Sequence, residues 1–296
     1  MEKMLRDKKV IALFILPALV LFIMFIPVPL ISSLGLSFFK WDLLSPPRFV
    51  GIRNFTRMIT LDNIFLMSVG NTFKYLIYSI VLQIPLAYFL AIMLTRGTRG
   101  EKIFRNLIFM PVILSGTAVA LMFYFIYHRD SGLINNIIRL FGNKDFAFAW
   151  LAEEKTALIA VCLSIAWQFT GYHMVIFITG ITGISYDILE AAKIDGANIM
   201  QTTWRIITPL MKPVLNVSLV LITTSSLKAF DSIFIMTQGG PLHATEVMAS
   251  YMFERAFHHL DYGYGCAISL ILFLLCVSFS SIISRIFRRK EEEIME

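Results

Sequence analysis

Charged residues are scarce in this sequence. Of its 296 residues only 16% are Asp, Glu, Lys or Arg, while 57% are hydrophobic. Soluble domains are about 45–50% apolar and about 25% charged, so the composition excludes an ordinary soluble domain and indicates an integral membrane protein. The net charge is +6, but the basic residues lie in short blocks beside apolar runs. That is a pattern of membrane topology and not of a nucleic-acid-binding surface.

Cysteine is rare as well. Cys162, Cys266 and Cys276 lie in apolar segments with no CxxC pair and no metal-ligand spacing, which is typical of small buried hydrophobic side chains. The sequence also lacks a Gly-rich phosphate loop, a nucleophile motif and a histidine–carboxylate pattern. We therefore expect no catalytic residue, no metal site and no bound cofactor in this chain.

Long apolar runs, by contrast, are present. Six are long enough to cross a hydrocarbon core of about 30 Å, and they cover residues 10–34, 69–95, 105–127, 156–180, 213–236 and 262–285. The first follows a basic start but has no small-x-small cleavage site after it, which predicts a retained helix. Prolines at 17, 27, 29, 85 and 111 predict bends. The expected fold is an all-α polytopic membrane protein with six transmembrane helices.

The basic blocks set the expected orientation. If the N-terminus is inside, all four blocks fall on the cytoplasmic side, and both termini are predicted to be cytoplasmic. The blocks are Lys3, Arg6, Lys8 and Lys9; Arg96, Arg99, Lys102 and Arg105; Lys193, Arg205 and Lys212; and Arg285, Arg288, Arg289 and Lys290. The predicted parts are a cytoplasmic start (1–9), a first helix with an outer segment (10–68), a five-helix core (69–285) with an inner loop (185–212), and a cytoplasmic tail (286–296).

The inner loop 185–212 is polar but rich in helix-forming residues. Ser185 is suited to cap a helix, and Asp187 and Glu190 would lie in its first turns, where the helix dipole favours anions. Gly196 would supply the turn that ends this helix. The sequence therefore predicts a short helix and a tight turn along one membrane surface.

A second helical run, 199–207, is expected to end before Pro209. An ordinary solvated connection between two spans would account for the loop, although such connections are usually shorter in compact bundles. Its apolar residues instead favour a surface that fits into a partner's groove. They are Ile188, Leu189, Ile194, Ile199, Met200 and Trp204.

The loop has the spacing Glu-Ala-Ala-x3-Gly-x9-Ile-x2-Pro from Glu190 to Pro209. This spacing resembles the signature loop of permease subunits of binding-protein-dependent ABC importers. Further segments resemble other parts of the same family, and the similarity covers nearly the whole chain; those at 237–241 and 244–245 resemble the maltose-type, carbohydrate-uptake members. The further segments are Phe49-Val50-Gly51-Ile52-Arg53-Asn54-Phe55, Gly132-Leu133-Ile134-Asn135, Trp150-Leu151, Trp167-Gln168 with Gly171, Thr237-Gln238-Gly239-Gly240-Pro241 and Ala244-Thr245.

The resemblance implies a type I ABC importer permease fold and a set of partners. These would be a second permease subunit, two cytoplasmic ATPase subunits that bind ATP and Mg, and an extracellular solute-binding protein. It also implies that the loop forms a coupling helix seated in a cleft of the ATPase. Ser185 stands where many members have proline, and Thr208 where they usually have leucine; neither change should abolish docking. The residues expected to act in coupling are Asp187, Glu190, Ala191, Ala192, Asp195, Gly196, Ala197, Ile206 and Pro209.

Two polar clusters are expected at membrane depth. In one continuous helix, Thr224, Lys228 and Asp231 would share a face beside Ser225. Charges at this depth face a cavity more often than lipid, so they either line a translocation path or form a Lys–Asp pair that holds the bundle. The second cluster lies in the fourth span and serves either as lining or as helix packing. It contains Gln168, Gly171 and Tyr172, with Thr170 and His173 beside them.

The sequence therefore predicts a permease subunit in a bacterial or archaeal cytoplasmic membrane. It would form half of the pathway for a sugar, oligosaccharide or related polyol, and separate subunits would hydrolyse ATP. One alternative is an ion-coupled secondary transporter with Lys228 and Asp231 as the coupling pair. Another is a membrane enzyme, for which His173 with Asp231 would be the acid–base candidates, although no motif supports them.

Overall fold

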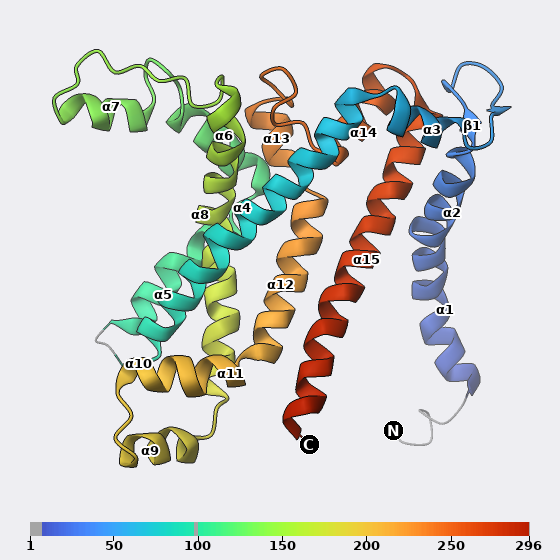
Figure 1. The fold of residues 1–296 in the computed structure, drawn as a ribbon. Coiled ribbons are helices and arrows are strands. Elements are labelled where there is room, and N and C mark those ends of the chain that lie inside the picture. The colour runs from blue at the N-terminus through green and yellow to red at the C-terminus, as the bar shows by residue number, and fades with distance from the viewer. Residues whose placement is uncertain (1–7, 98–99, 296) are drawn as a thin grey trace. The chain divides into compact units, whose positions relative to one another are not determined.

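The computed structural model describes residues 8–97 and 100–295, which are almost all helical (Figure 1). They belong to two compact units. Unit 1 contains Met1–Asp62 and Met252–Ile271, and unit 2 contains Asn63–Tyr251 and Leu272–Glu296. Of the predicted cytoplasmic start 1–9, residues 1–7 with Lys3 and Arg6 lie outside the described residues, as does Arg99. The side chains of Lys8, Lys9, Arg288, Arg289 and Lys290 also lie outside them.

In unit 1 the first apolar segment consists of α1 (Lys8–Phe25) and α2 (Pro27–Leu36). The helix is interrupted at Ile26, before Pro27, whereas Pro17 lies inside α1 without a break. Leu13–Leu36 is long and apolar enough to cross a membrane, and its most apolar stretch is not buried within the chain. A helix that is apolar all round and unburied is typical of contact with lipid.

A short hairpin follows this segment. Strands β1 (Phe39–Lys40) and β2 (Arg48–Phe49) are antiparallel, with Phe39 opposite Phe49 and Lys40 opposite Arg48. The next helix is α3 (Arg53–Thr60). The buried Asn54 side chain donates from Nδ2 to the carbonyl oxygens of Ser37 (2.8 Å) and Phe39 (3.0 Å). These bonds fix the hairpin against α3.

Two long helices, α4 (Asn63–Leu94) and α8 (Glu154–Thr182), pack along each other and form the centre of unit 2. Pro85 lies inside α4 without breaking it. The buried side chains form two clusters, one toward each end of the pair. The first includes Tyr75, Leu158, Val161, Cys162 and Ile233; the second includes Ala87, Ala91, Met174, Phe177 and Met211.

The third predicted span, 105–127, is not one straight helix. It consists of α5 (Glu101–Phe109), a 3-10 turn η2 (Met110–Ile113) and α6 (Gly116–Ile126), and its two halves meet at 97°. Ser115 caps α6, since its Oγ accepts a hydrogen bond from the amide of Ala118 at 3.2 Å. Among the described residues four helices can each cross a membrane, and six spans result if each of the two bent pairs counts as one.

Besides α9 to α12 (residues 186–227), which belong to the candidate site, the described residues form four shorter helical elements and a long last helix. The shorter elements are α7 (Leu133–Leu140), α13 (Asp231–Met236), α14 (Met248–Phe253) and the π-helical turn η4 (Glu254–His258). Asn135 supports α7 by donating to the carbonyl oxygens of Arg129 and Phe148, both at 2.8 Å. The last helix, α15 (Tyr262–Met295), continues without a break through residues 286–295 of the predicted tail.

Candidate functional site

The predicted helical loop is present at one end of unit 2, opposite the end that carries α7 (Figure 1). Helix α9 (Tyr186–Ile194) covers its first part. The chain then reverses at Gly196, which has a φ of +78°, a left-handed conformation that glycine adopts at little cost. The amide of Ala197 closes this turn by donating to the carbonyl oxygen of Ala192 at 3.0 Å. The predicted helix and glycine turn are therefore confirmed.

The start of α9 differs from the prediction. Ser185 is the residue before the helix, but its side chain makes no capping bond to the backbone. Its hydroxyl instead donates to Oδ2 of Asp187 at 3.4 Å. Asp187 itself lies in the first turn, as expected. The dipole of the helix, and not a serine cap, is therefore the interaction that favours an acid at this end.

The second half of the loop begins with a capping box that our sequence interpretation did not use. Asn198 Oδ1 accepts from the amide of Gln201 (2.9 Å), and Gln201 Oε1 accepts from the amide of Asn198 (2.8 Å). An Asn followed three residues later by Gln is a variant of the known helix-start signature. The signal was present in the sequence.

The helix after this box continues further than predicted. It consists of α10 (Ile199–Gln201), the π-helical turn η3 (Thr202–Ile207) and α11 (Thr208–Leu210), and so passes through Pro209. Pro209 directly follows the π-helical turn η3, where the regular α-helical hydrogen bonding is already interrupted. The Thr208 hydroxyl donates to the Thr203 carbonyl oxygen (2.8 Å) and shares a bond with the Tyr88 hydroxyl of α4 (2.7 Å). The loop is thereby attached to the centre of unit 2.

The surface of α9–α11 is apolar and carries charges of both signs. The side chains of Ile194 and Trp204 are 80% and 61% exposed, which is unusual for large apolar residues outside an interface. Among the expected coupling residues, the buried one is Ala192, and Ala197, Ile206 and Pro209 are half-buried. The exposed ones are Asp187, Glu190, Ala191, Asp195 and Gly196.

A second candidate site in unit 2 is a cavity of about 320 Å³ between α4, α8, the end of α12 (Lys212–Leu227) and the residues that follow it. It brings together most of the polar residues singled out in the sequence. Gln168, Tyr172, Ser225, Lys228 and Asp231 line it, together with His173. The structure adds lining residues that the sequence analysis did not select, namely Tyr75, Ser226 and Ser232.

Lys228 and Asp231 line this cavity, but they do not lie on one continuous helix as predicted. α12 ends at Leu227 and α13 begins at Asp231, so the predicted span 213–236 is interrupted and the two residues do not share a face of one helix. Both are exposed, and no ion pair joins them within the part of the chain that the structure describes. The alternative of a bundle-holding Lys–Asp pair is therefore wrong for this conformation.

Thr224 and Gly171 do not line the cavity. The Thr224 hydroxyl donates to carbonyl oxygens of its own helix, those of Val220 (2.8 Å) and Leu221 (3.1 Å). At Gly171, a Cβ would lie 2.1 Å from the Ile108 carbonyl oxygen, so this glycine allows α8 to approach the backbone of α5. The prediction that Gly171 lines the pathway is therefore wrong, because this glycine serves the packing of two helices.

Gln168 and His173 combine lining with packing. Gln168 Nε2 donates to the carbonyl oxygen of Leu114, in the bend between α5 and α6, at 3.0 Å. His173 Nδ1 and the Ser218 hydroxyl form a buried hydrogen bond of 2.6 Å between α8 and α12. The cavity thus presents hydroxyl, amide and imidazole groups with one free ammonium and one free carboxylate. Such a surface can bind a polyhydroxylated solute by hydrogen bonds.

Comparison with known proteins gives one consistent result. The family described as "Binding-protein-dependent transport system inner membrane component" matches residues 83–292. The chain is 32% identical to the probable ABC transporter permease protein YurN of Bacillus subtilis, over 98% of this chain and 100% of that one. It is 31% identical to the trehalose/maltose transport system permease protein MalF of Thermococcus litoralis, over 96% of each chain.

The fold is also that of a solved transporter. Crystal structures describe a bacterial ABC transporter involved in import of the acidic polysaccharide alginate, also in complex with an alginate pentasaccharide-bound periplasmic protein. The matching chain of the first has a TM-score of 0.84 at 20% identity and covers 97% of this chain and 98% of its own. The predicted importer-permease fold is therefore confirmed.

Proposed function

Because the chain belongs to the family of binding-protein-dependent transport system inner membrane components, we propose that it is one of two permease subunits of an ATP-driven ABC importer. Permeases of this family are transmembrane subunits without enzymatic activity, and a separate subunit is the ATPase. The chain is accordingly a multi-pass protein of the plasma membrane. In the proposed importer it forms half of the pathway for a solute.

The observation that carries this proposal is the surface of α9–α11. It is a helical, attached platform with exposed apolar side chains, and Glu190 and Asp187 lie exposed on it. Such a platform fits the cleft of a partner protein and can transmit a push without deforming. We assign this surface to a cytoplasmic ATPase, two copies of which would bind ATP and Mg. The coupling residues would be those named above, from Asp187 to Pro209.

The same assignment sets the orientation. With α9 on the cytoplasmic side, the end of unit 2 that carries α7 faces outward. We expect both termini to be cytoplasmic as well, as the basic blocks of the sequence predict. The basic residues Lys193, Arg205 and Lys212 then lie inside, in agreement with the distribution of Lys and Arg along the sequence. An external solute-binding protein would deliver the solute to the opposite, outward end.

We assign the cavity beside α8 to the solute pathway and expect a sugar, oligosaccharide or related polyol. Two observations support this class. The lining is rich in hydroxyl and amide groups, and relatives include a trehalose/maltose permease and an alginate importer. Gln168, Tyr172, Ser225, Lys228 and Asp231 are the residues that would contact the solute. An ion-coupled secondary transporter is not favoured, because the family and the fold are those of ABC importers.

The first test is to purify the tagged chain from its native membrane in mild detergent and to identify its partners by mass spectrometry. We expect a second permease of similar size and an ATPase. Glu190→Arg should reduce the recovered ATPase by about tenfold or more, since hydrogen bonds to charged groups contribute about 1.5–3 kcal/mol and each 1.4 kcal/mol is tenfold.

The matched control for this experiment is Glu153→Arg. This glutamate is also exposed, makes no capping bond, and lies at the other end of unit 2, so its reversal should leave the ATPase bound. A chain that purifies alone or as a homodimer would contradict the proposed function. Equal loss of the ATPase in both variants would contradict the assignment of the α9–α11 surface.

A further prediction concerns the two charges of the cavity. Lys228→Gln and Asp231→Asn should each lower uptake about 10- to 100-fold, the range expected when a charged hydrogen bond to solute is lost. Because the two residues form no ion pair with each other, the double variant should be at least as impaired as either single variant. Uptake by reconstituted vesicles is the measurement. Restored uptake in the double variant would show that the two charges act as a structural pair.

A further inference from the structure

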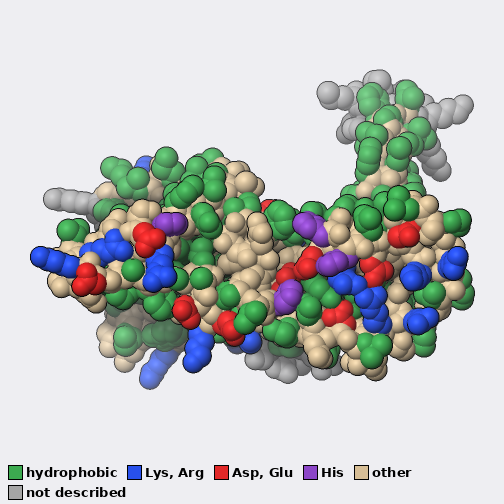
Figure 2. Space-filling model, turned by 90° about the horizontal axis from the view of Figure 1, so that it is seen from above, with side chains coloured by type: hydrophobic (Ala, Val, Ile, Leu, Met, Phe, Trp, Pro, Cys, Tyr) green, Lys and Arg blue, Asp and Glu red, His purple; other side chains and the backbone are tan. Residues whose placement is uncertain are grey.

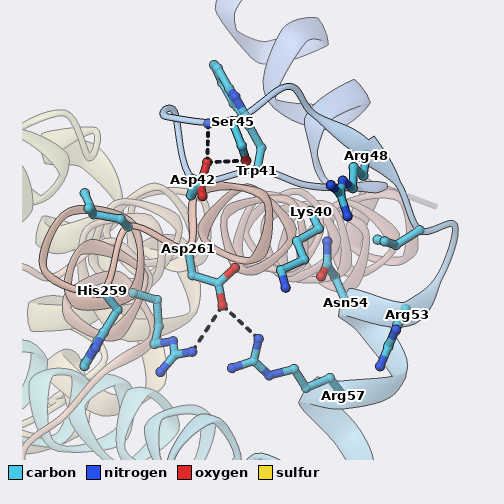
Figure 3. Close-up of a pocket in the computed structure, with 13 residues that line it drawn as sticks. Lys40, Trp41, Asp42, Ser45, Arg48, Arg53, Asn54, Arg57, His259 and Asp261 are labelled. Carbon is cyan, nitrogen blue, oxygen red and sulfur yellow. Dashed lines mark hydrogen bonds and ion pairs between the residues drawn. The ribbon is translucent and has the colours of Figure 1, made fainter.

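Unit 1 contains a cavity with a volume of about 810 Å³. It lies between the β1–β2 hairpin, the start of α3 and the segment that precedes α15. Lys40, Arg48 and Arg53 come from the hairpin and from α3, and Asp261 lies across from them (Figure 3). No step of the proposed import function uses this cavity, and its lining has an unusual balance of charge.

Five Lys and Arg residues line the cavity, against two carboxylates. The basic residues are Lys40, Arg48, Arg53, Arg57 and Arg255, and the acidic ones are Asp42 and Asp261. Blue side chains gather over this part of the face in the space-filling view (Figure 2). The hydrogen-bond partners of the two carboxylates do not remove this excess of positive charge.

One carboxylate serves two guanidinium groups. Oδ2 of Asp261 accepts from Nη1 of Arg57 at 2.8 Å and from Nη2 of Arg255 at 3.1 Å. Both guanidinium groups lie over the ring of Tyr264, at 4.3 and 5.4 Å from its centre, which favours cations. Burial lowers the pKa of Arg57, but the hydrogen bond and charge of Asp261 outweigh it and raise that pKa above its ordinary value. Arg57, Arg255 and Asp261 together therefore carry one positive charge in excess, and Asp62, which accepts from the Tyr264 hydroxyl at 2.6 Å, also raises the pKa of Arg57.

Arg255 also retains a free donor. Its Nε is buried and has no hydrogen-bond partner among the described residues. A buried donor without a partner costs free energy, and guanidinium groups bind oxyanions by paired hydrogen bonds. The two arginines are held in place by Asp261 and Tyr264, so they need no rearrangement to receive an oxyanion.

The other carboxylate is occupied by its own loop. Oδ1 of Asp42 accepts from the amide (2.8 Å) and hydroxyl (2.7 Å) of Ser45 and from the amide of Leu44 (3.1 Å). These bonds, those from Ser45 first, hold the pKa of Asp42 below its usual value. Asp42 therefore shapes the hairpin loop and forms no ion pair with the nearby cations within the described residues.

Lys40, Arg48 and Arg53 consequently have no acidic partner in the described part of the chain. Lys40 and Arg48 are moreover directly opposite each other in the β1–β2 pair. Like charges in that position destabilise a strand pair. An anion placed between them would turn this repulsion into attraction.

The position of the cavity indicates which anion it meets. Leu13–Leu36 and Tyr262–Phe287 are both able to cross a membrane, and the cavity is lined by the residues that follow the first and precede the second. It is therefore at the level where membrane helices leave the hydrocarbon. Trp41 in its wall contacts Tyr262, with ring centres 6.2 Å apart, and Trp and Tyr are typical of the lipid headgroup region.

We propose that this cavity binds the phosphate of an anionic phospholipid headgroup. Lys40, Arg48 and Arg53 contact the phosphate oxygens, and Arg57 and Arg255 supply fixed donors at the cavity wall. Arginine forks match the geometry of phosphate, and clusters of basic residues beside membrane helices attract anionic lipids. The bound lipid tethers the hairpin of unit 1 to the membrane surface. This inference holds whichever solute the importer carries.

The test uses the full-length chain with its co-purifying subunits, inserted in nanodiscs of phosphatidylglycerol and phosphatidylcholine. Bound lipids are counted by native mass spectrometry after release. We expect the wild type to retain phosphatidylglycerol selectively. Arg48→Gln/Arg53→Gln should weaken this binding about 25-fold, about fivefold for each charge. The control Lys144→Gln/Lys155→Gln removes two exposed charges elsewhere and should bind as the wild type does. Lys40→Gln, across the hairpin from Arg48, is a second variant if the first folds poorly.

Three outcomes would overturn the proposal. One is unchanged phosphatidylglycerol retention in Arg48→Gln/Arg53→Gln. A second is binding of inorganic phosphate in lipid-free detergent, lost in the same variant, without selective retention of lipid; the site would then belong to a soluble phosphate. The third is that Arg48→Gln/Arg53→Gln retains lipid as the wild type does but loses the ATP hydrolysis that the external binding protein stimulates. That result would assign the basic surface to docking of this protein.

Discussion

Gly171→Ala should prevent most of the chain from accumulating in folded form. A Cβ at this position would lie 2.1 Å from the carbonyl oxygen of Ile108 and 2.8 Å from Cα of Phe109. Both contacts are with backbone, which cannot rotate away as a side chain can. Overpacking of a core costs about 1–3 kcal/mol and occasionally more, and a backbone clash of this size belongs at the upper end. The measurement is the yield of monodisperse protein by size exclusion in detergent, with its thermal midpoint.

The chain provides a matched control in Gly70, which lies in α4 of the same unit. A Cβ there meets nothing within 4 Å, so Gly70→Ala should be neutral or stabilise the helix by up to about 1 kcal/mol. If both variants were equally abundant and equally stable, the close approach of α8 to α5 would be contradicted. If neither variant accumulated in folded form, the helices would be intolerant of substitution in general, and the result would not be due to the contact at Gly171.

Gly196→Val should abolish most uptake while leaving a folded, membrane-inserted chain. Gly196 has a φ of +78° and open space around its Cβ position, so the substitution introduces backbone strain without a clash. Such strain costs about 1–3 kcal/mol, which lowers the equilibrium constant for forming the native turn about 5- to 150-fold. The turn orients α9 against α10, and a disordered turn cannot present the α9–α11 surface to an ATPase. Uptake and co-purification of the ATPase are the measurements.

The variant Gly196→Asn tests whether backbone strain, and not the mere presence of a side chain, causes the loss of uptake. Asparagine tolerates the left-handed conformation far better than valine does, so Gly196→Asn should keep most of the uptake. Yield and thermal midpoint should be near those of the wild type for both variants, because the site is exposed. Full uptake in Gly196→Val would contradict the role of this turn. Equal impairment in both variants would mean that the surface tolerates no side chain there.

Hydropathy and the basic blocks were sufficient to predict the membrane class, the helical fold and the approximate position of each span. In lipid every backbone polar group must be bonded, so a long apolar run has almost no choice but to be helical. The turn at Gly196 was predictable for a similar local reason, since a glycine between two helix-forming stretches typically takes a positive φ. These features depend on residues that are close in sequence.

The features that were missed depend on contacts between distant segments. Pro111 indicated a bend, but the angle of 97° depends on Gln168, which bonds the freed carbonyl of Leu114, and on Gly171, which admits the backbone of α5. The break after Leu227 separates Lys228 from Asp231, and no local signal such as proline or glycine marks it. Periodicity assumes an unbroken helix, so it placed Thr224 in a lining to which it does not belong.

The bend between α5 and α6 has a consequence for how the chain enters the membrane. α6 has 11 residues, about 17 Å of helix, which is little more than half of a hydrocarbon core of about 30 Å. Neither half can therefore enter as a span by itself, whereas the two together are long enough when straight. If the bent pair forms one span, the segment can cross the membrane as one straight helix when it inserts and bend afterwards. The glutamine that bonds the bent backbone is in α8, which the ribosome makes later, so a nascent chain that ends before α8 would hold this segment straight.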